Sequence, residues 1–239
     1  MNILSIIPAR GGSKGLPNKN ILQVAGHPLL AYSIAAGIQS TSITRVICST
    51  DSEKIAEIAL SYGAEVPFLR PEKYAMDHSQ DIEVFIHALE WLQKTEQYKP
   101  DIIVQLRPTS PIRFINDIET GIDLLRNNSQ ADSVRGISET LTTPYKMWKI
   151  KSNGFLNPLL NLSGEKEPYN LPRQKLPLVY AQNGTLEVIR YKTIIDKKSM
   201  TGDNILPLMI DQQYYVDIDT HRSLMLAELI IKETNCIKP

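Results

Sequence analysis

The sequence contains few cysteines and carries no net charge. Among its 239 residues only two are cysteine, Cys48 and Cys236, and they lie far apart. Two distant cysteines form neither a disulfide framework nor a metal-binding cluster, so the sequence favours a reducing, cytoplasmic location. The four histidines show no spacing typical of metal ligands. A histidine or cysteine metal centre is therefore not expected.

The charge is balanced, because Lys+Arg and Asp+Glu both number 26. A net charge of zero gives no general attraction for nucleic acid or for an anionic membrane, so any basic site must be local. The chain also lacks a basic leader before an apolar stretch, and no apolar run approaches the roughly 20 residues that span a bilayer. Neither nucleic acid nor a membrane is expected as a partner.

The hydrophobic pattern predicts one α/β domain over residues 1–239. Short apolar runs predict strands, and apolar residues at helical spacing predict helices. The strands are expected at 3–7, 45–49, 64–69, 102–106, 185–189 and 214–219, and the helices at 28–40, 53–62, 82–92 and 220–232. Strands that alternate with helices imply crossover connections and a doubly wound, mostly parallel sheet. Residues 139–182, with scattered prolines and an Asn-Gly pair, predict an inserted β-rich arm.

The loop after the first strand carries the strongest functional indication. It contains several glycines and three cations, Arg10, Lys14 and Lys19. Glycine lets backbone amides approach a ligand closely, and the cations supply charge for a polyanion. Its spacing matches neither the ordinary phosphate loop nor the dinucleotide fingerprint. A nucleoside triphosphate is the expected ligand, and a purely structural turn between strand and helix is the alternative.

Two carboxylates, Asp217 and Asp219, follow an extended segment with Ile218 between them. Alternation along such a segment directs both carboxylates to one side and Ile218 to the core. With no cation beside them in sequence they would repel, and Mg²⁺ would relieve the repulsion. The alternative is that Asp219 or Thr220 caps the helix that follows.

Further polar residues follow predicted strands or lie in the arm. Asp51 comes directly after one strand. Two roles are consistent with this position, a contact to a ligand and a cap of the next helix. Arg107 leaves a central strand, and a buried arginine there favours an anionic ligand. Arg173 lies in the arm, where its guanidinium would suit a carboxylate, although a solvated loop charge is the other interpretation.

Together these segments resemble the acylneuraminate cytidylyltransferases. The resemblance rests on residues 10–20, 49–51, 69–71, 107–111, 172–174 and 217–219. It implies an α/β fold of nucleotidyltransferase type, with a projecting dimerisation arm at about 139–182. It also implies a Mg²⁺-dependent enzyme that activates a nine-carbon ulosonic (nonulosonic) acid with CTP and releases pyrophosphate. The expected assembly is a homodimer.

The resemblance also implies residue roles. The catalytic residues would be Arg10, Lys19, Asp217 and Asp219, the last two also holding the metal. The nucleotide would contact Arg10, Gly11, Gly12, Ser13, Lys19, Asn20, Arg70, Ser79 and Asp81. The sugar would contact Arg107, Thr109, Ser110, Lys146, Arg173, Gln174 and Glu187, with Arg173 on its carboxylate.

The chain departs from the family pattern at two of these positions. Arg107 stands where many relatives have Gln, and Glu187 stands where they have Tyr. Both changes alter how sugar substituents are recognised, so sialic acid, legionaminic acid and a deaminated relative all remain open. A sugar-1-phosphate nucleotidyltransferase and a non-catalytic nucleotide- or sugar-binding homologue are the alternative functions.

Overall fold

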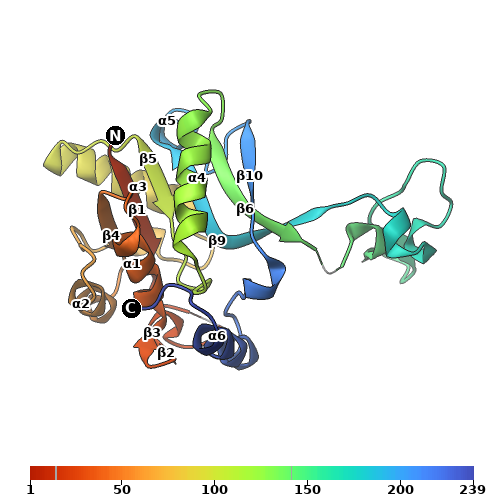
Figure 1. Ribbon diagram of the computed structural model, residues 1–239, viewed down its shortest axis with the longest axis horizontal. Coiled ribbons are helices and arrows are strands. Elements are labelled where there is room, and N and C mark those ends of the chain that lie inside the picture. The colour runs from red at the N-terminus through yellow and green to blue at the C-terminus, as the bar shows by residue number, and fades with distance from the viewer. Residues whose placement is uncertain (14, 141) are drawn as a thin grey trace.

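A central six-stranded sheet organises the molecule (Figure 1). The computed structural model describes residues 1–13, 15–140 and 142–239. The strand order is β10-β6-β9-β5-β1-β4, in which β9 is antiparallel to β5 and β6 and the other pairs are parallel. The bounds are β1 Ile3–Pro8, β4 Arg45–Ser49, β5 Ile102–Gln105, β6 Ser133–Glu139, β9 Tyr180–Arg190 and β10 Ile205–Met209. The expected mostly parallel α/β sheet is confirmed.

Helices cover both faces of this sheet. One face packs against α1 (Leu29–Gln39), α2 (Glu53–Ser61) and α4 (Ile115–Asn127). The other packs against α3 (Asp81–Glu96) and α5 (Tyr191–Ile195). The last helix, α6 (His221–Glu233), contacts β2 (Gln23–Val24), which pairs with β3 (His27–Pro28). No helix in the described part of the chain is long and apolar enough to cross a membrane.

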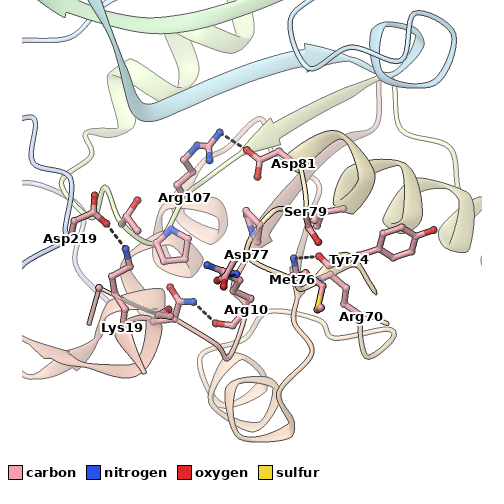
Figure 2. Close-up of a pocket in the computed structure, with 17 residues that line it drawn as sticks. Arg10, Lys19, Arg70, Tyr74, Met76, Asp77, Ser79, Asp81, Arg107 and Asp219 are labelled. Carbon is pink, nitrogen blue, oxygen red and sulfur yellow. Dashed lines mark hydrogen bonds and ion pairs between the residues drawn. The ribbon is translucent and has the colours of Figure 1, made fainter. Parts of the chain in front are cut away.

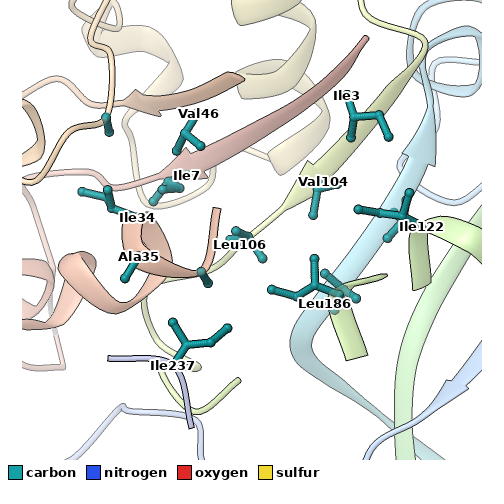
Figure 3. Close-up of a cluster of buried hydrophobic side chains, with 14 of the residues drawn as sticks. Ile3, Ile7, Ile34, Ala35, Val46, Val104, Leu106, Ile122, Leu186 and Ile237 are labelled. Carbon is teal, nitrogen blue, oxygen red and sulfur yellow. The ribbon is translucent and has the colours of Figure 1, made fainter. Parts of the chain in front are cut away.

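The alternation along β1 explains why the sheet is buried on both sides. Ile3 and Ile7 join the core cluster under α1, α2 and α4, shown in Figure 3, while Leu4 and Ile6 join the cluster under α3 and α5. Because successive strand residues point to opposite faces, a continuous apolar run fits a strand covered on both faces. The loop that follows β1 is thereby anchored by a rigid, fully buried strand.

The arm leaves the sheet between β6 and β9. These strands pair as far as Glu139 opposite Tyr180, so residues 140–179 form an excursion that projects from the sheet (Figure 1). Its described residues form two short strands, β7 (Trp148–Ile150) and β8 (Leu156–Pro158), and 3₁₀ turns at Pro144–Lys146, Pro168–Asn170 and Arg173–Lys175. The excursion lies where the sequence predicts an arm.

Two expected strands are not formed. Residues 64–69 make only isolated bridges to β4 and its end, through Glu65 and Leu69. Pro67 interrupts this run, and proline has no N–H for a sheet ladder. The segment 214–219 begins with a 3₁₀ turn at Gln212–Tyr214 and continues without strand pairing. The expectations that α1, α2, α3, β4 and β5 form near their observed bounds are confirmed.

Candidate active site

A cavity of about 510 Å³ opens beyond the carboxyl ends of β1 and β5 (Figure 2). Its lining contains most of the charged residues that the sequence analysis selected. The lining residues are Pro8, Arg10, Ser13, Gly15, Lys19, Asn20, Arg70, Tyr74, Met76, Asp77, Ser79, Asp81, Val84, Arg107, Pro108, Thr109 and Asp219. Ligands gather at this edge in open α/β sheets.

The loop after β1 presents two cations to this cavity. Arg10 Nη1 lies 2.9 Å from Asp77 Oδ1, and Lys19 Nζ lies 2.7 Å from Asp219 Oδ1. The buried Asn20 donates through Nδ2 to the Arg10 carbonyl oxygen at 2.9 Å, which ties the two ends of the loop together. Both cations are thus paired with carboxylates. Lys14, the third cation of this loop, lies outside the described residues.

The two glycines expected at the nucleotide do not line the cavity. Gly11 donates its backbone N–H to Asp51 Oδ1 at 2.9 Å. A Cβ at Gly11 would meet Ser52 Cβ at 3.2 Å, whereas a Cβ at Gly12 would meet nothing. Ser52 also caps α2 by accepting from the Ile55 N–H. Asp51 therefore supports the loop, and the cap belongs to Ser52.

The alternation expected around Asp217 and Asp219 is confirmed, although the segment is not a strand. Val216 and Ile218 are buried, and both aspartates are exposed. The Ile218 N–H donates to the Thr109 carbonyl oxygen at 2.8 Å, which places Asp219 beside the loop after β5. Asp219 lines the cavity and Asp217 does not.

The helix cap at this point is Thr220. Its side chain accepts from the Ser223 N–H at 3.1 Å. Asp219 is therefore not needed as the cap and remains available to the cavity, with Lys19 as its partner.

Arg70 is buried at the cavity wall and holds a neighbouring loop. It is 5% exposed, and it donates to the Ser49 carbonyl oxygen at 2.9 Å and to that of Tyr74 at 3.3 Å. Its Nε finds no hydrogen-bond partner in the described part of the chain. Burial lowers the pKa of Arg70, and the nearby Asp51 opposes the shift.

Arg107 joins the cavity to a charge network inside the sheet. Its Nη2 lies 2.5 Å from Asp81 Oδ2 and 3.2 Å from Glu187 Oε1. Glu187 is 2% exposed, and its other oxygen accepts from Arg135 Nη2 at 2.8 Å. Burial would lower the pKa of Arg107, but the carboxylates of Asp81 and Glu187 raise it overall. The guanidinium at this wall is a permanent cation.

The remaining residues expected at the sugar divide into two groups. Thr109 lines the cavity, and Ser110 is buried beside it with an Oγ that lacks a partner among the described residues. The arm residues lie elsewhere: Arg173 donates to the Thr140 carbonyl oxygen at 2.6 Å. Arg173 and Gln174 line a separate cavity of about 370 Å³ in the arm. Lys146 lies in the arm too. Within one chain these three residues are not brought to the first cavity.

Sequence reasoning missed several lining residues. Tyr74, Met76 and Asp77 come from the connection between α2 and α3, and Val84 comes from the first turn of α3. Arg70 and Pro71 mark the start of this loop in the sequence. Nothing in the local pattern indicates that Asp77 reaches Arg10, which lies 67 positions earlier.

Comparison with known proteins gives a consistent result. A family model described as cytidylyltransferase matches residues 4–194. CMP-N,N'-diacetyllegionaminic acid synthase of Legionella pneumophila is 35% identical over 234 residues, covering 97% of each chain. Pseudaminic acid cytidylyltransferase of Campylobacter jejuni serotype O:2 is 42% identical over 232 residues, again covering 97% of each chain.

The fold is also similar to a solved structure, CMP:2-keto-3-deoxy-manno-octonic acid synthetase complexed with CTP. The TM-score is 0.72 at 15% identity, and the match covers 98% of this chain and 99% of that one. At this identity the likeness concerns the fold. The sequence matches span nearly the whole chain, and they carry the conclusion that this protein belongs to the cytidylyltransferase family.

Proposed function

We propose that this protein transfers CMP from CTP to a nonulosonic acid, giving the CMP-sugar and pyrophosphate. The observation that carries the proposal is that Arg10, Lys19 and Asp219 line one cavity at the carboxyl end of β1. Two cations suit a triphosphate, and an exposed carboxylate suits its metal. The relatives named for CMP-legionaminic and pseudaminic acid synthesis support a nonulosonic acid as the acceptor.

In this proposal the loop after β1 binds the triphosphate. Arg10 and Lys19 would exchange their carboxylate partners for phosphate oxygens, with Ser13 assisting. Asn20, Arg70, Ser79 and Asp81 would contact the nucleoside, since all four line the same cavity.

The donor chemistry fits a magnesium ion that arrives with the nucleotide. No group of three or more His, Cys, Asp or Glu side chains in the described residues could hold a metal alone. Mg²⁺ is commonly held by one or two carboxylates together with substrate phosphates and water. Asp219, assisted by Asp217, would supply these oxygens, and the bound ion would neutralise charge on the phosphates.

The reaction forms one bond and breaks one. The anomeric hydroxyl oxygen of the sugar bonds to the α-phosphorus, and the bond from that phosphorus to the β-phosphate oxygen breaks, releasing pyrophosphate. The hydroxyl proton passes to solvent water or to the released pyrophosphate. Arg10 and Lys19 stabilise the negative charge that develops on the phosphates, which is the main contribution a protein makes to phosphoryl transfer.

We also propose a cytoplasmic homodimer built through the arm. Arg173 and Lys146 lie away from the cavity of their own chain, so they would bind the sugar carboxylate in the partner's site. Exposed apolar side chains on the arm, among them Ile150 and Phe155, suit burial against a second copy. The two cysteines are buried and unpaired, which fits a reducing compartment.

Pyrophosphate release tests the proposed reaction. The protein is assayed with Mg²⁺, each of the four ribonucleoside triphosphates, and a panel of nonulosonic acids. Release is expected only with CTP and a nonulosonic acid together. Arg10→Ala should lower turnover by about 10²- to 10³-fold, the usual effect of losing one preorganised contact to developing charge.

Arg126→Ala is the matched control, because Arg126 forms an exposed ion pair with Asp123 on α4. It should leave turnover unchanged. Release with a sugar 1-phosphate in place of the nonulosonic acid, or CTP binding without any release, would contradict the proposal.

A further inference from the structure

Residues 70–79, here called the wall segment, form one wall of the cavity. The segment contains a 3₁₀ turn at Glu72–Tyr74, and the rest of it is turn, bend or irregular backbone. Its side chains that line the cavity are Arg70, Tyr74, Met76, Asp77 and Ser79. An irregular segment at the surface depends on side-chain contacts to keep one position. The contacts that hold the wall segment therefore matter for the cavity.

The Tyr74 ring joins the middle of the wall segment to α3. It packs on the ring of His87, with centroids 5.2 Å apart and planes inclined by 43°. His87 in turn meets the buried Phe68 edge-on, at 4.9 Å and 85°. Phe68 also packs against Trp91 of α3, at 5.2 Å. His87 thus lies in the middle of an aromatic stack that ends in the core under α3 and α5.

Three successive backbone carbonyl oxygens, at residues 73–75, each accept a hydrogen bond from a side chain that lines the cavity. The donors are Ser79 Oγ at 3.1 Å, Arg70 Nη1 at 3.3 Å and Arg10 Nη1 at 3.4 Å. Figure 2 shows the contact between Arg70 and Tyr74. Because Tyr74 is the central residue of the three, the place of its ring on α3 determines where these donors lie.

The surroundings of His87 favour its neutral form. Its Nδ1 is buried and has no hydrogen-bond partner in the described part of the chain. An imidazolium carries an N–H on both nitrogens, so protonation would bury a donor without an acceptor. Arg70 and Lys73 on the wall segment add like charge, Glu90 on α3 opposes them, and the aromatic neighbours are uncharged. Burial and, after it, the two cations lower the pKa of His87 from its usual 6.5.

We propose that His87 is a positioning residue whose neutral ring holds the wall segment in place for the nucleotide, so that acidification weakens nucleotide binding. This role rests on the proposed function and deepens it, because it makes the nucleotide half of the site sensitive to pH. His87 itself does not line the cavity. When protonated it repels Arg70 and Lys73, and the wall segment separates from α3.

Binding of CTP at different pH values tests this role. The Kd is measured by calorimetry from pH 8 to pH 5.5, with Mg²⁺ and without sugar. His87→Phe keeps an aromatic ring and cannot be protonated, so at pH 8 its Kd should lie within about twofold of the wild-type value. Towards pH 5.5 the ratio of the wild-type Kd to the His87→Phe Kd should rise about 3- to 10-fold. Titration of CTP itself affects both proteins equally and cancels in the ratio.

A comparison of the two substrates separates positioning from a general structural role. His87→Ala removes the ring beneath Tyr74, so it should weaken CTP binding by about 2- to 10-fold at pH 8. The KM for the nonulosonic acid, measured by pyrophosphate release at saturating CTP, should stay within about twofold. A loss of overall stability would affect both substrates alike.

His27→Phe is the matched control. His27 also lies in an aromatic cluster, edge-on to Tyr32 and Tyr62, and it does not line the cavity. The variant should reproduce the wild-type Kd at every pH. If it changes the pH profile as His87→Phe does, the effect does not belong to His87 and the proposal is wrong.

Tyr74→Leu keeps the proposal testable if His87→Ala does not fold. It removes the ring on the other side of the stack, in the wall segment itself. Adding His87→Phe to Tyr74→Leu should then change the pH profile no further, because His87 acts through Tyr74. A wild-type pH profile in His87→Phe, an equal change for CTP and the sugar acid, or a further change in the double variant would each overturn the positioning role.

Two measurements distinguish failure of the proposed function from failure of the role of His87. If the wild-type protein binds CTP with the expected pH dependence but releases no pyrophosphate with any nonulosonic acid, the proposed function fails and the role of His87 stands. If it releases pyrophosphate while the Kd ratio stays constant with pH, only the role of His87 fails. A wild-type protein that does not bind CTP contradicts both.

Discussion

At the scale of single residues, the ion pair between Lys19 and Asp219 connects two distant parts of the site. Their ion pair joins the loop after β1 to the segment before α6, across 200 positions of sequence. The Asp219 side chain remains 66% exposed while that of Lys19 is 15% exposed. The carboxylate is therefore the accessible member of the pair.

Asp219→Asn should abolish most activity and preserve the fold. The substitution removes one anionic metal ligand, and metal stabilisation of transition-state charge contributes several kcal/mol, so a large rate loss is expected. Turnover measured across Mg²⁺ concentrations checks this, with circular dichroism as the folding control. Near-normal turnover at limiting Mg²⁺ would rule out Asp219 as a ligand.

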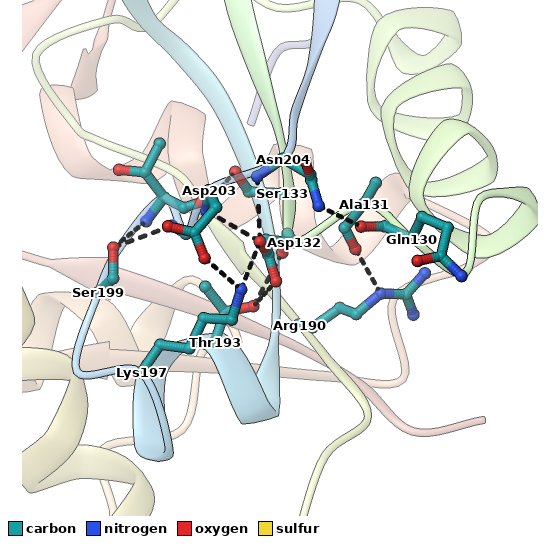
Figure 4. Close-up of polar contacts among 12 residues, drawn as sticks. Gln130, Ala131, Asp132, Ser133, Arg190, Thr193, Lys197, Ser199, Asp203 and Asn204 are labelled. Atoms are coloured by element: carbon teal, nitrogen blue, oxygen red, sulfur yellow. Dashed lines mark hydrogen bonds and ion pairs between the residues drawn. The ribbon is translucent and has the colours of Figure 1, made fainter.

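Asp132 is a second residue with a defined effect, in this case on stability (Figure 4). Lys197 Nζ donates to its Oδ2 at 2.8 Å, and the backbone N–H groups of Asp203 and Asn204 donate to the same oxygen at 2.9 and 3.1 Å. The hydrogen bond from Lys197 and these backbone contacts lower the pKa of Asp132 from 3.8 to about 2, against the opposing effect of burial. The native state therefore favours the charged form.

The free energy of unfolding should decrease as the pH is lowered through the range in which the Asp132 carboxyl group becomes protonated. A depressed native pKa stabilises the fold fully above the unfolded pKa of 3.8, and the contribution is lost as pH falls towards about 2. Urea unfolding between pH 6 and pH 2 is the measurement. Asp132→Asn should be less stable at pH 6 and should show a shallower pH dependence, and an unchanged slope would contradict the assignment.

At the scale of elements, the loop between α5 and β10 packs closely against Asp132. Gly202 has φ of +71°, and a Cβ there would lie 2.3 Å from Asp132 Cβ. Gly164 in the arm has a similar φ of +83°, and a Cβ there would meet nothing within 4 Å. Both glycines have a positive φ that would strain a residue with a Cβ, and they differ in the space around them.

Gly202→Ala should destabilise the protein more than Gly164→Ala. Positive φ alone costs an alanine about 1 to 2 kcal/mol, and both variants carry that cost. Gly202→Ala adds a collision with Asp132, so its loss of unfolding free energy should be clearly larger. Chemical denaturation of the two variants side by side checks this, and equal losses would show that the loop moves aside freely.

Elements with strong local patterns could be predicted from the sequence, and those built by tertiary contact could not. The largely apolar β1 and β5, and α2 with its Ser52 cap, match their expected positions. The strand β6 was missed because Arg135 and Gly136 interrupt its apolar run. Gly136 is needed there, since a Cβ would lie 2.6 Å from Asn183 Oδ1.

The residues of the candidate site likewise fall into those that could be predicted from the sequence and those that could not. Arg10, Lys19 and Arg107 could be selected because each follows or leaves a recognisable strand, and all three line the cavity. The partners of these residues could not be selected. Asp77 and Glu187 reach Arg10 and Arg107 only through contacts between segments 67 and 80 positions apart, which no local pattern encodes.

At the scale of the whole molecule, the arm separates one group of proposed site residues from the other. Arg173 lies beside Thr140 in the arm, whereas Asp219 lies at the cavity. If the arm reaches a second copy, one complete site needs residues from both chains.

Mixing inactive Arg173→Ala subunits with inactive Asp219→Ala subunits should restore part of the activity. In such a heterodimer one site receives Asp219 from one chain and Arg173 from the other, while the second site lacks both. Pyrophosphate release by tagged, purified heterodimers is the measurement. No recovery in verified heterodimers, or a monomer in analytical ultracentrifugation, would show that Arg173 does not serve a partner's site.

The antiparallel pairing of β6 with β9 makes the arm, in topological terms, the loop of one β-hairpin. The residues that flank it, Glu139 and Tyr180, are paired neighbours, so lengthening or shortening residues 140–179 requires no rethreading of the sheet. Each doubling of a flexible loop's length costs only about 0.6 kcal/mol in closure entropy. This hairpin loop can therefore be lengthened, shortened or exchanged while the sheet that carries the cavity stays as it is.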